Sequence, residues 1–502
     1  MVYSPSQLGC CVAGLGGLPS RQEFRQPEQK RRVFKVLSSS SSQLNPCGRV
    51  IRSTLPRFTT EIPFIKLGFI CLNVPGHLNP MTTLARHLQY RNHEVVFLYS
   101  SGAAGLPFVP GPEKDHFNEN RPAVSKMQGE DALQFTAHVV LAQTEAMLKS
   151  LPAMVQANGV DALVLDTGQR YAELGAMQLG MPYVHVSNSL HLDFSGYTPL
   201  CLYGWPHETT PAALARNREG VAKVVRLLQS SNASIRAHVE KAGLRIDWEN
   251  PSYTLSPLAA ITQVPRAFDF ESSHWPPQFH HTGPFHDGKG RENVDFPWKR
   301  LTGEPLIYAS MGTILNGRLD VFRTIVAALA KHNDLQLVLS VGDQVAPEQI
   351  GPVPSNAIIV KRAPQLELLK QTSVCITHAG LNTVLESLAQ GVPQVAIPVT
   401  YDQPGVAARI ADKKTGVVTS LGELTADHLS TLLDEVLNNS TYRDNARKLQ
   451  KAIAKANGLS VAADIVEESL GVTEKASKAD WLMCRAAAAR PKWSKSASTV
   501  KK

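Results

Sequence analysis

The stretch Arg362–Gln403, RAPQLELLKQTSVCITHAGLNTVLESLAQGVPQVAIPVTYDQ, contains the pattern that decides the fold of this chain. A short apolar run at Ser373–Thr377 stops at a histidine and a glycine, and an amphipathic helix is predicted over Leu381–Gln390. A Gly-Val-Pro turn closes that helix, and a second apolar run, Gln394–Pro398, follows it. The pattern therefore predicts a strand, a helix and a strand, with polar side chains only where the strands end.

These polar side chains lie where an open α/β sheet binds its ligands, beyond the carboxyl ends of the strands. His378 and Gly380 stand at the first strand end, and Asp402 and Gln403 follow the second. The helix that starts there presents free N–H groups and the positive end of its dipole, which suits a phosphate. The segment predicts a site for a phosphorylated ligand, with a carboxylate and an amide available for hydroxyl groups.

The two ends of the chain carry its net positive charge. The chain has 502 residues, 43% hydrophobic and 19% charged, and this length favours two globular domains with tails. The formal net charge is +8, yet residues 1–60 hold nine Lys and Arg against two acids, and residues 474–502 hold eight against two. The remaining body has 34 basic and 39 acidic residues, so we expect no nucleic-acid partner.

Cysteine usage and hydropathy indicate a reducing, aqueous compartment. The seven cysteines are scattered without a CxxC pair, which argues against a disulfide framework or a zinc site. No apolar run approaches the length that crosses a bilayer, so we expect at most peripheral membrane contact. We expect a cytoplasmic protein. The alternative is a plastid or mitochondrion, because the Arg- and Ser-rich N-terminus is similar to a transit peptide.

Repeated strand–helix units in two halves predict an α/β fold of two doubly wound, Rossmann-like domains that face each other across a cleft. We place the first domain at residues 63–290 and the second at 303–450, and expect a helix in 451–473 to pack back toward the first. Residues 1–62 and 474–502 are basic and Ser-rich, and are predicted to be disordered tails. The predicted strands are 65–74, 94–99, 162–165, 183–186, 306–309 and 336–341, and the predicted helices 79–91, 130–158, 171–179, 319–331 and 442–469.

The first predicted strand–helix turn contains a candidate general base. In Val74-Pro75-Gly76-His77-Leu78-Asn79-Pro80, glycine permits a tight turn and Asn79-Pro80 marks a helix start. His77 follows the carboxyl end of the first strand, and imidazole titrates near neutral pH. Asp166 ends another apolar strand at the same edge, where its carboxylate can orient the ring. The alternatives are a histidine that only bonds the helix start and an aspartate that only caps the next turn.

A hydroxyl-bearing turn, Ser310-Met311-Gly312-Thr313, follows a strand in the second half. Its N–H and O–H groups can approach a phosphate, although a plain βα loop has the same composition. The chain has no Asp-x-Asp sequence, so we expect no metal that chelates a diphosphate. Hydrogen-bond donors and the helix dipole would then stabilise a departing diphosphate.

The 362–403 segment resembles the donor-binding signature of family 1 UDP-dependent glycosyltransferases. The sequences THAGLNTVLESL, YDQPGVAARI and YASMGT are most similar to those of the bacterial and cyanobacterial branch of that family. The resemblance covers residues 65–470 and implies the two-domain GT-B architecture. It rests on Ala363-Pro364-Gln365, His378, Gly380, Asn382-Thr383, Glu386, Gly391-Val392-Pro393, Pro398, Asp402-Gln403 and, as the catalytic turn, Gly76-His77 with Asn79-Pro80.

The resemblance implies a role for each matching residue. His77 would deprotonate an acceptor hydroxyl, with Asp166 as its charge partner. Glu386 would accept from ribose hydroxyls, and Asp402 and Gln403 would bind the sugar hydroxyls. The backbone and side chain near Gln365 would meet the uracil edge. The whole donor-binding set is Gly76, Ser310, Thr313, Gln365, His378, Gly380, Asn382, Thr383, Glu386, Asp402 and Gln403, in which His378 and the 380–383 backbone would hold the diphosphate.

Two departures separate this chain from the plant form of the signature. Arg362 stands where the plant form has a Trp that stacks on uracil, and a guanidinium plane can also stack on a base. Leu381 replaces a second Trp, and the segment is two residues shorter between Gln365 and His378. These differences favour the bacterial-type branch and leave the uridine contact open.

The predicted activity is inverting, metal-independent transfer of a hexose, expected to be glucose, from a UDP-sugar to a hydroxyl of a small molecule. No cofactor besides the co-substrate is expected. Aromatic and apolar residues within 100–150 and 187–260 favour a lipophilic acceptor, which could be a carotenoid, a terpenoid or sterol, or a phenolic compound. We expect a monomer. The alternatives are a sugar-nucleotide epimerase of similar fold and a non-catalytic sugar-nucleotide-binding protein.

Overall fold

The computed structural model describes residues 65–472 apart from 113, 230–232, 273, 290 and 292. The two predicted tails, and with them the transit-peptide alternative, lie outside the described residues. No helix in the described part of the chain combines the length and hydropathy needed to cross a bilayer.

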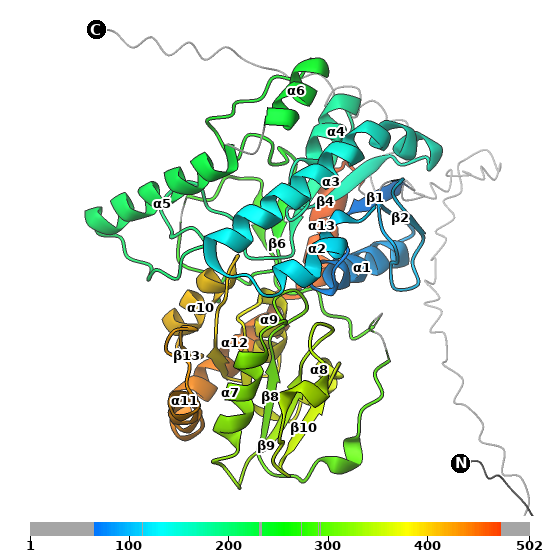
Figure 1. Cartoon of the computed structure of the whole chain (residues 1–502). Coiled ribbons are helices and arrows are strands. Elements are labelled where there is room, and N and C mark those ends of the chain that lie inside the picture. The colour runs from blue at the N-terminus through cyan, green and yellow to red at the C-terminus, as the bar shows by residue number, and fades with distance from the viewer. Residues whose placement is uncertain are drawn as a thin grey trace, which may run out of the picture. The chain divides into compact units, whose positions relative to one another are not determined.

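The N-terminal half is built on a seven-stranded, all-parallel sheet (Figure 1). Its spatial order is β3-β2-β1-β4-β5-β6-β7, so the strand order reverses between β1 and β4. The strands are β1 (Lys66–Ile70), β2 (Glu94–Leu98), β3 (Phe108–Val109), β4 (Ala162–Asp166), β5 (Tyr183–Ser187), β6 (Ala260–Thr262) and β7 (Phe279–His281). The helices are α1 (Pro75–Tyr90), α2 (His116–Val124), α3 (Gly129–Ala157), α4 (Ala172–Leu179), α5 (Pro211–Gln229) and α6 (Ala233–Lys241).

The C-terminal half has a six-stranded parallel sheet in the order β10-β9-β8-β11-β12-β13, the strand order of a dinucleotide-binding fold. Its strands are β8 (Leu306–Ser310), β9 (Gln336–Ser340), β10 (Ala357–Val360), β11 (Thr372–Thr377), β12 (Gln394–Ala396) and β13 (Gly416–Val418). Its helices are α7 (Leu319–Leu329), α8 (Gln365–Leu369), α9 (Leu381–Ala389), α10 (Gln403–Asp412), α11 (Ala426–Asn438), α12 (Ser440–Ala456) and α13 (Gly458–Ser469), with 3₁₀ turns at Trp298–Arg300 and Pro347–Ile350. The prediction of two doubly wound α/β halves is confirmed.

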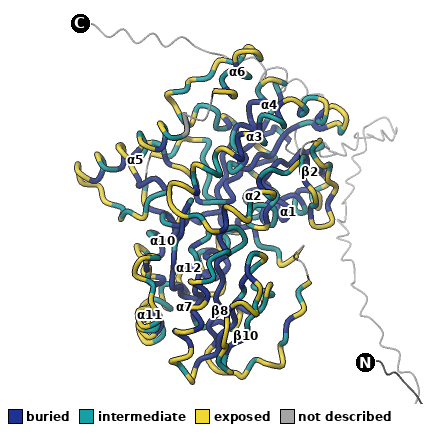
Figure 2. The backbone as a smooth tube through the Cα atoms, in the orientation of Figure 1, coloured by how far each residue is buried: buried dark blue, intermediate teal, exposed yellow. Residues whose placement is uncertain are grey.

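Both faces of the first sheet are covered by helices, which explains why its central strands, β1 and β4, are largely apolar. Ala162 and Val164 of β4 enter a buried cluster with α1 and α13, whereas Leu163 and Leu165 enter another with α3 and α4. Successive strand residues point to opposite faces, so a strand covered on both sides has no polar positions. Polar side chains are left for the strand ends. Figure 2 shows the buried residues concentrated along the strands of both halves.

The last predicted helix, 442–469, is wrong as a single element. The chain forms α12 and α13 instead, and Asn457 between them has a left-handed backbone with φ of 48°. A Cβ on Gly458 would lie 2.4 Å from the carbonyl oxygen of Gly283, so the break lets the chain pass closely by the segment that follows β7. After the break, Ala462, Ala463 and Val466 of α13 join the core of the N-terminal half.

The first helix starts earlier than predicted, at Pro75 rather than Asn79. Pro75 occupies the first helical position, where its fixed φ and missing N–H cost nothing. His77 therefore lies in the first turn of α1 and not in a loop before it. Pro80 falls inside the helix.

Candidate active site

The structure brings His77 and Asp166 together at the carboxyl edge of the first sheet. His77 Nδ1 lies 2.6 Å from Asp166 Oδ2, and the aspartate side chain is fully buried. The N–H of Gly168 donates to Asp166 Oδ1 at 3.0 Å, and the N–H of Leu72 donates to Oδ2 at 3.4 Å. These bonds hold the carboxylate against the ring. Asp166 therefore pairs with His77 and also caps the turn after β4.

The electrostatics of the pair favour an orienting carboxylate and a basic imidazole. Burial lowers the pKa of His77, but the charge of Asp166 and the hydrogen bond to it outweigh burial, so that the pKa is raised above 6.5. Burial alone would raise the pKa of Asp166, yet the charge and hydrogen bond of His77 bring it below its usual 3.8. With Nδ1 donating to Asp166, the neutral ring keeps its lone pair on Nε2, where an acceptor proton can go.

A glycine is needed beside the His77 ring. A Cβ on Gly168 would lie 2.7 Å from Cε1 of His77 and 3.1 Å from Asp166 Oδ2. Any larger residue would push the ring away from its carboxylate. The turn after β4 thus supplies both a hydrogen bond and the space for the base.

His378 occupies the corresponding place in the second half, at the end of β11. Its ring is enclosed by two glycines: a Cβ on Gly312 or on Gly380 would lie 2.4 Å from ring atoms. Burial lowers its pKa to about 4, although a backbone hydrogen bond with Ser310 acts in the opposite direction. Its buried Nδ1 has no hydrogen-bond partner among the described residues. His378 is therefore a neutral imidazole with an unused polar atom.

Helix α9 begins directly after His378. Its N-cap is Gly380, which has no side chain to bond the first N–H groups, and Ala379 before it has φ of 62°. Uncapped N–H groups and the helix dipole make this end suited to an anion. Thr383 in this first turn is nearly buried. The side chain of Asn382 instead donates to the carbonyl of Gly76 at 2.6 Å, across the two halves.

Glu386 and Gln365 bond each other within the predicted donor site. Gln365 Nε2 donates to Glu386 Oε2 at 2.5 Å, and Gln365 Oε1 accepts from the hydroxyl of Tyr308 at 2.9 Å. The other oxygen of Glu386 accepts from Arg291, a residue of the interdomain linker, also at 2.5 Å. A carboxylate has about four lone-pair positions, so two acceptor positions of Glu386 are left for ligand hydroxyls. The sequence analysis missed Arg291, because nothing near it in the chain marks a site.

Asp402 and Gln403 lie at the start of α10, as the strand-end pattern indicates. Asp402 Oδ2 accepts from the N–H of Leu190 in the first half at 2.7 Å, and burial raises the pKa of Asp402. Gln403 Oε1 accepts from the N–H groups of Val399 and Thr400 at 2.9 and 3.1 Å. Each side chain thus has one oxygen engaged within the protein, and the charge of Asp402 in the second half raises the pKa of His77 in the first.

The other residues that the sequence predicts near the donor are Ser310, Thr313 and Arg362, and each contacts a different part of the protein. Ser310 is buried, and its hydroxyl oxygen accepts from the N–H of Gly312 at 3.3 Å. The carbonyl of Thr313 accepts from Arg121 of α2 at 2.9 Å, so this turn also touches the first half. Arg362 pairs with Asp343 at 3.1 Å.

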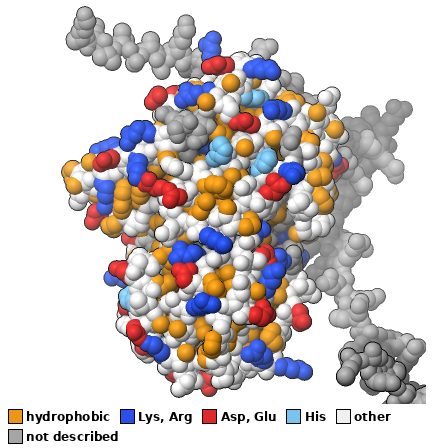
Figure 3. Space-filling model, viewed as in Figure 1, with side chains coloured by type: hydrophobic (Ala, Val, Ile, Leu, Met, Phe, Trp, Pro, Cys, Tyr) orange, Lys and Arg blue, Asp and Glu red, His pale blue; other side chains and the backbone are white. Residues whose placement is uncertain are grey.

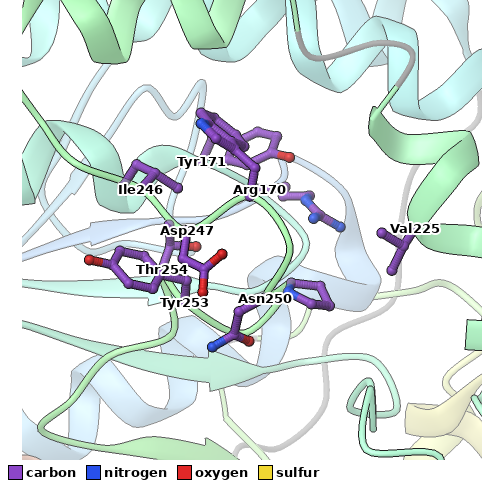
Figure 4. Close-up of a pocket in the computed structure, with 10 residues that line it drawn as sticks. Arg170, Tyr171, Val225, Ile246, Asp247, Asn250, Tyr253 and Thr254 are labelled. Atoms are coloured by element: carbon purple, nitrogen blue, oxygen red, sulfur yellow. The ribbon is translucent and has the colours of Figure 1, made fainter. Parts of the chain in front are cut away.

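Two other features of the described residues have the composition of a ligand or metal site. A pocket beyond the turn after Asp166, lined by residues that include Arg170, Tyr171 and Tyr253, has a volume of about 30 Å³, far less than the roughly 300–1,000 Å³ of a small-molecule site (Figure 4). Among the described residues, His191, Asp269 and His281 have ligand atoms within 4.8 Å of one another. Arg409 already binds Asp269 at 2.7 Å, and a guanidinium on that carboxylate disfavours a second cation. We interpret this group as a buried ion-pair cluster.

The surface in Figure 3 carries Lys and Arg side chains interspersed with acidic ones. The balance of charge counted along the body of the chain is therefore visible on this face as a mixture of both signs.

Comparison with known proteins finds similarity to glycosyltransferases. Residues 293–456 match the family described as UDP-glucoronosyl and UDP-glucosyl transferase. The zeaxanthin glucosyltransferase of Pantoea ananas is 29% identical over 328 residues, which cover 65% of this chain and 75% of that protein. The zeaxanthin glucosyltransferase of Pseudescherichia vulneris is 27% identical over 420 residues, covering 80% of this chain and 97% of that protein.

Solved structures share the fold over nearly their whole length. The glycosyltransferase of kitacinnamycin has a TM-score of 0.62 and 24% identity, and covers 81% of this chain and 98% of its own. The calicheamicin glycosyltransferase CalG4 has a TM-score of 0.60 and 20% identity, with the same coverage of 81% and 98%. The predicted GT-B architecture is confirmed.

Proposed function

We propose that the chain is a glycosyltransferase of the UDP-dependent family, which transfers glucose from UDP-glucose to a hydroxyl of a lipophilic small molecule, with inversion and without a metal ion. The observation that carries this proposal is the His77–Asp166 pair at the edge of one sheet, joined through Gly76 to the uncapped N-terminus of α9 in the other. A base and an anion site then face each other.

His77 would act as the general base. With Nδ1 held by Asp166, the Nε2 lone pair of His77 would accept the proton of the acceptor hydroxyl as its oxygen attacks the anomeric carbon. Asp166 would stabilise the imidazolium that forms. Attack from the face opposite the nucleotide exchanges the C–O bond to phosphate for a C–O bond to the acceptor, and inverts the anomeric centre.

The leaving diphosphate would be stabilised in the second half. The free N–H groups at the start of α9 would receive its developing charge, and the unpartnered Nδ1 of His378 is available to donate to it. Glu386 would accept from the ribose hydroxyls with the positions that Gln365 and Arg291 leave free. Asp402 and Gln403 would bind the sugar hydroxyls. Gly76, Ser310 and Thr313 border the same site.

The acceptor class rests on the relatives. Two of them are named as zeaxanthin glucosyltransferases, and another, 29% identical over 413 residues, as demethyllactenocin mycarosyltransferase of Streptomyces fradiae. We therefore propose a hydroxylated carotenoid, terpenoid, sterol or phenolic acceptor, and no observation favours the epimerase alternative.

An acceptor panel tests the proposal. The full chain is incubated with UDP-glucose, with and without EDTA, and with hydroxylated carotenoids, sterols and phenols, and products are read by mass spectrometry. A mass gain of one hexose, with a β-linkage by NMR and no effect of EDTA, supports it. Conversion of UDP-glucose alone to another sugar nucleotide would contradict it.

A further inference from the structure

One backbone carbonyl in the first turn of α1 is left without a helical partner. In an α-helix the N–H of each residue donates to the carbonyl four positions earlier. The partner for the carbonyl of Gly76 would be the N–H of residue 80, but residue 80 is proline and has none. Pro80 therefore leaves the Gly76 carbonyl free, although it lies inside the helix.

The free carbonyl is bonded from the other half of the protein. Asn382 Nδ2 donates to it at 2.6 Å from a position 306 residues away in the chain. Asn382 is the second residue of α9, two positions after the N-cap Gly380. The bond thus joins the helix end proposed for the donor to the peptide unit that precedes the proposed base.

We propose that Asn382 is a positioning residue that fixes His77 relative to the donor, rather than a ligand of the diphosphate. This inference rests on the proposed function. The bonded carbonyl belongs to the peptide group shared by Gly76 and His77, so any shift of the Asn382 amide moves the backbone of the base. Asp166 sets the rotation of the imidazole ring, and Asn382 sets how far the ring stands from the first turn of α9.

Two other side-chain hydrogen bonds between the halves do not involve the catalytic turn. Gln128 Oε1 accepts from Arg318 at 3.0 Å on the surface, and Thr136 bonds the hydroxyl of Tyr401 at 2.7 Å. These bonds can hold the halves together, but they have no contact with the backbone of residues 76–77. Gln128→Ala is therefore a matched control that removes one side-chain bond between the halves and spares the base.

Kinetics of three variants test the proposal. Asn382→Ala removes the donor, Asn382→Asp keeps the shape without an N–H, and Pro80→Ala supplies a competing helical N–H to the Gly76 carbonyl. For both Asn382 variants we expect kcat to fall at least about tenfold, since small displacements of reacting groups have effects of this size. The Kd for UDP should stay within about threefold, and Gln128→Ala should leave kcat unchanged. Adding Pro80→Ala to Asn382→Ala should lower kcat no further.

The outcomes separate this inference from the proposed function. Equal losses in UDP affinity and kcat would make Asn382 a diphosphate ligand, and unchanged kcat would also overturn the proposal. If the wild-type chain transfers no sugar, the proposed function fails. Hydrogen exchange can still test whether the bond between Asn382 and the Gly76 carbonyl orders the start of α1. Asn382→Ala should then increase deuterium uptake at the start of α1, and Gln128→Ala should not. Equal uptake in wild type and Asn382→Ala would overturn the inference.

Discussion

Asp166 holds His77 through a 2.6 Å contact between Oδ2 and Nδ1, and the same carboxylate takes the N–H of Gly168 on its other oxygen. The pair is assembled from the ends of two neighbouring parallel elements, the turn after β1 and the end of β4. This arrangement determines both the direction of the His77 ring and its proton affinity.

Asp166→Asn tests the electrostatic part of that claim. In the wild type the pKa of His77 is raised, so its base form appears only as the pH rises above 6.5, and the acid limb of kcat/KM lies there. Without the carboxylate charge, burial dominates and lowers the pKa, so the acid limb should move to lower pH. The plateau rate should fall by about 10²–10⁴, because the amide no longer stabilises the imidazolium. A pH profile from 5 to 9 checks both effects, and an unmoved limb would show that His77 does not titrate in catalysis.

Gly312→Ala tests the placement of His378. Gly312 has φ of 74°, and its Cβ would lie 2.4 Å from the His378 ring. We expect the ring to be displaced and the Kd for UDP to rise at least about tenfold, equivalent to about 1.4 kcal/mol. Gly303→Ala is the matched control, since Gly303 has φ of 92° and open space around its Cβ. It should share the backbone strain and keep UDP affinity, as measured by calorimetry; equal loss in both variants would remove the role of His378.

Arg291→Ala tests the linker contact with Glu386. The Glu386 side chain is 1% exposed, and Arg291 Nη2 lies 2.5 Å from its Oε1. Without Arg291 the buried carboxylate would have no ion-pair partner and would lie close to an anionic ligand. We expect weaker binding of UDP-glucose, with Arg291→Lys recovering part of it. Arg91→Ala removes an ion pair with two more exposed carboxylates, Asp464 and Glu467, at the C-cap of α1, and should leave binding unchanged. Tighter binding to Arg291→Ala would instead identify Arg291 as a competitor of the donor.

Arg409→Met tests the buried ion pair between the halves. Arg409 is 2% exposed and binds Asp269 at 2.7 and 2.8 Å, and His281 bonds the other carboxylate oxygen at 2.7 Å. Removing the arginine leaves a buried carboxylate, for which the expected loss of unfolding free energy is about 3–5 kcal/mol. The exposed pair Arg318–Asp320 provides the control, and Arg318→Ala should lose at most about 1 kcal/mol. Urea denaturation of the three proteins measures the difference, and equal midpoints would contradict the assignment.

The sequence was sufficient for the central strands and for the strand-end side chains, but it missed β3, β6, β7, β10 and β13. Apolar runs with polar termini gave β4, β8 and β11 within about one residue, because strands buried on both faces have few alternatives. It was insufficient where a contact joins distant segments. Pro80 was visible as a helix-start signal, but its effect depends on Asn382, which no local pattern links to it. The partners Arg291 and Leu190 of predicted site residues were missed for the same reason.

Sugar transfer and UDP binding by His77→Ala test the central claim most directly. His77 is proposed to accept the acceptor proton, and the second half to bind the nucleotide. The rate of sugar transfer by the variant should therefore fall by at least about 10²-fold. Its Kd for UDP should remain within about twofold of the wild type. A parallel loss of UDP affinity, or transfer at an undiminished rate, would contradict the assignment of the base.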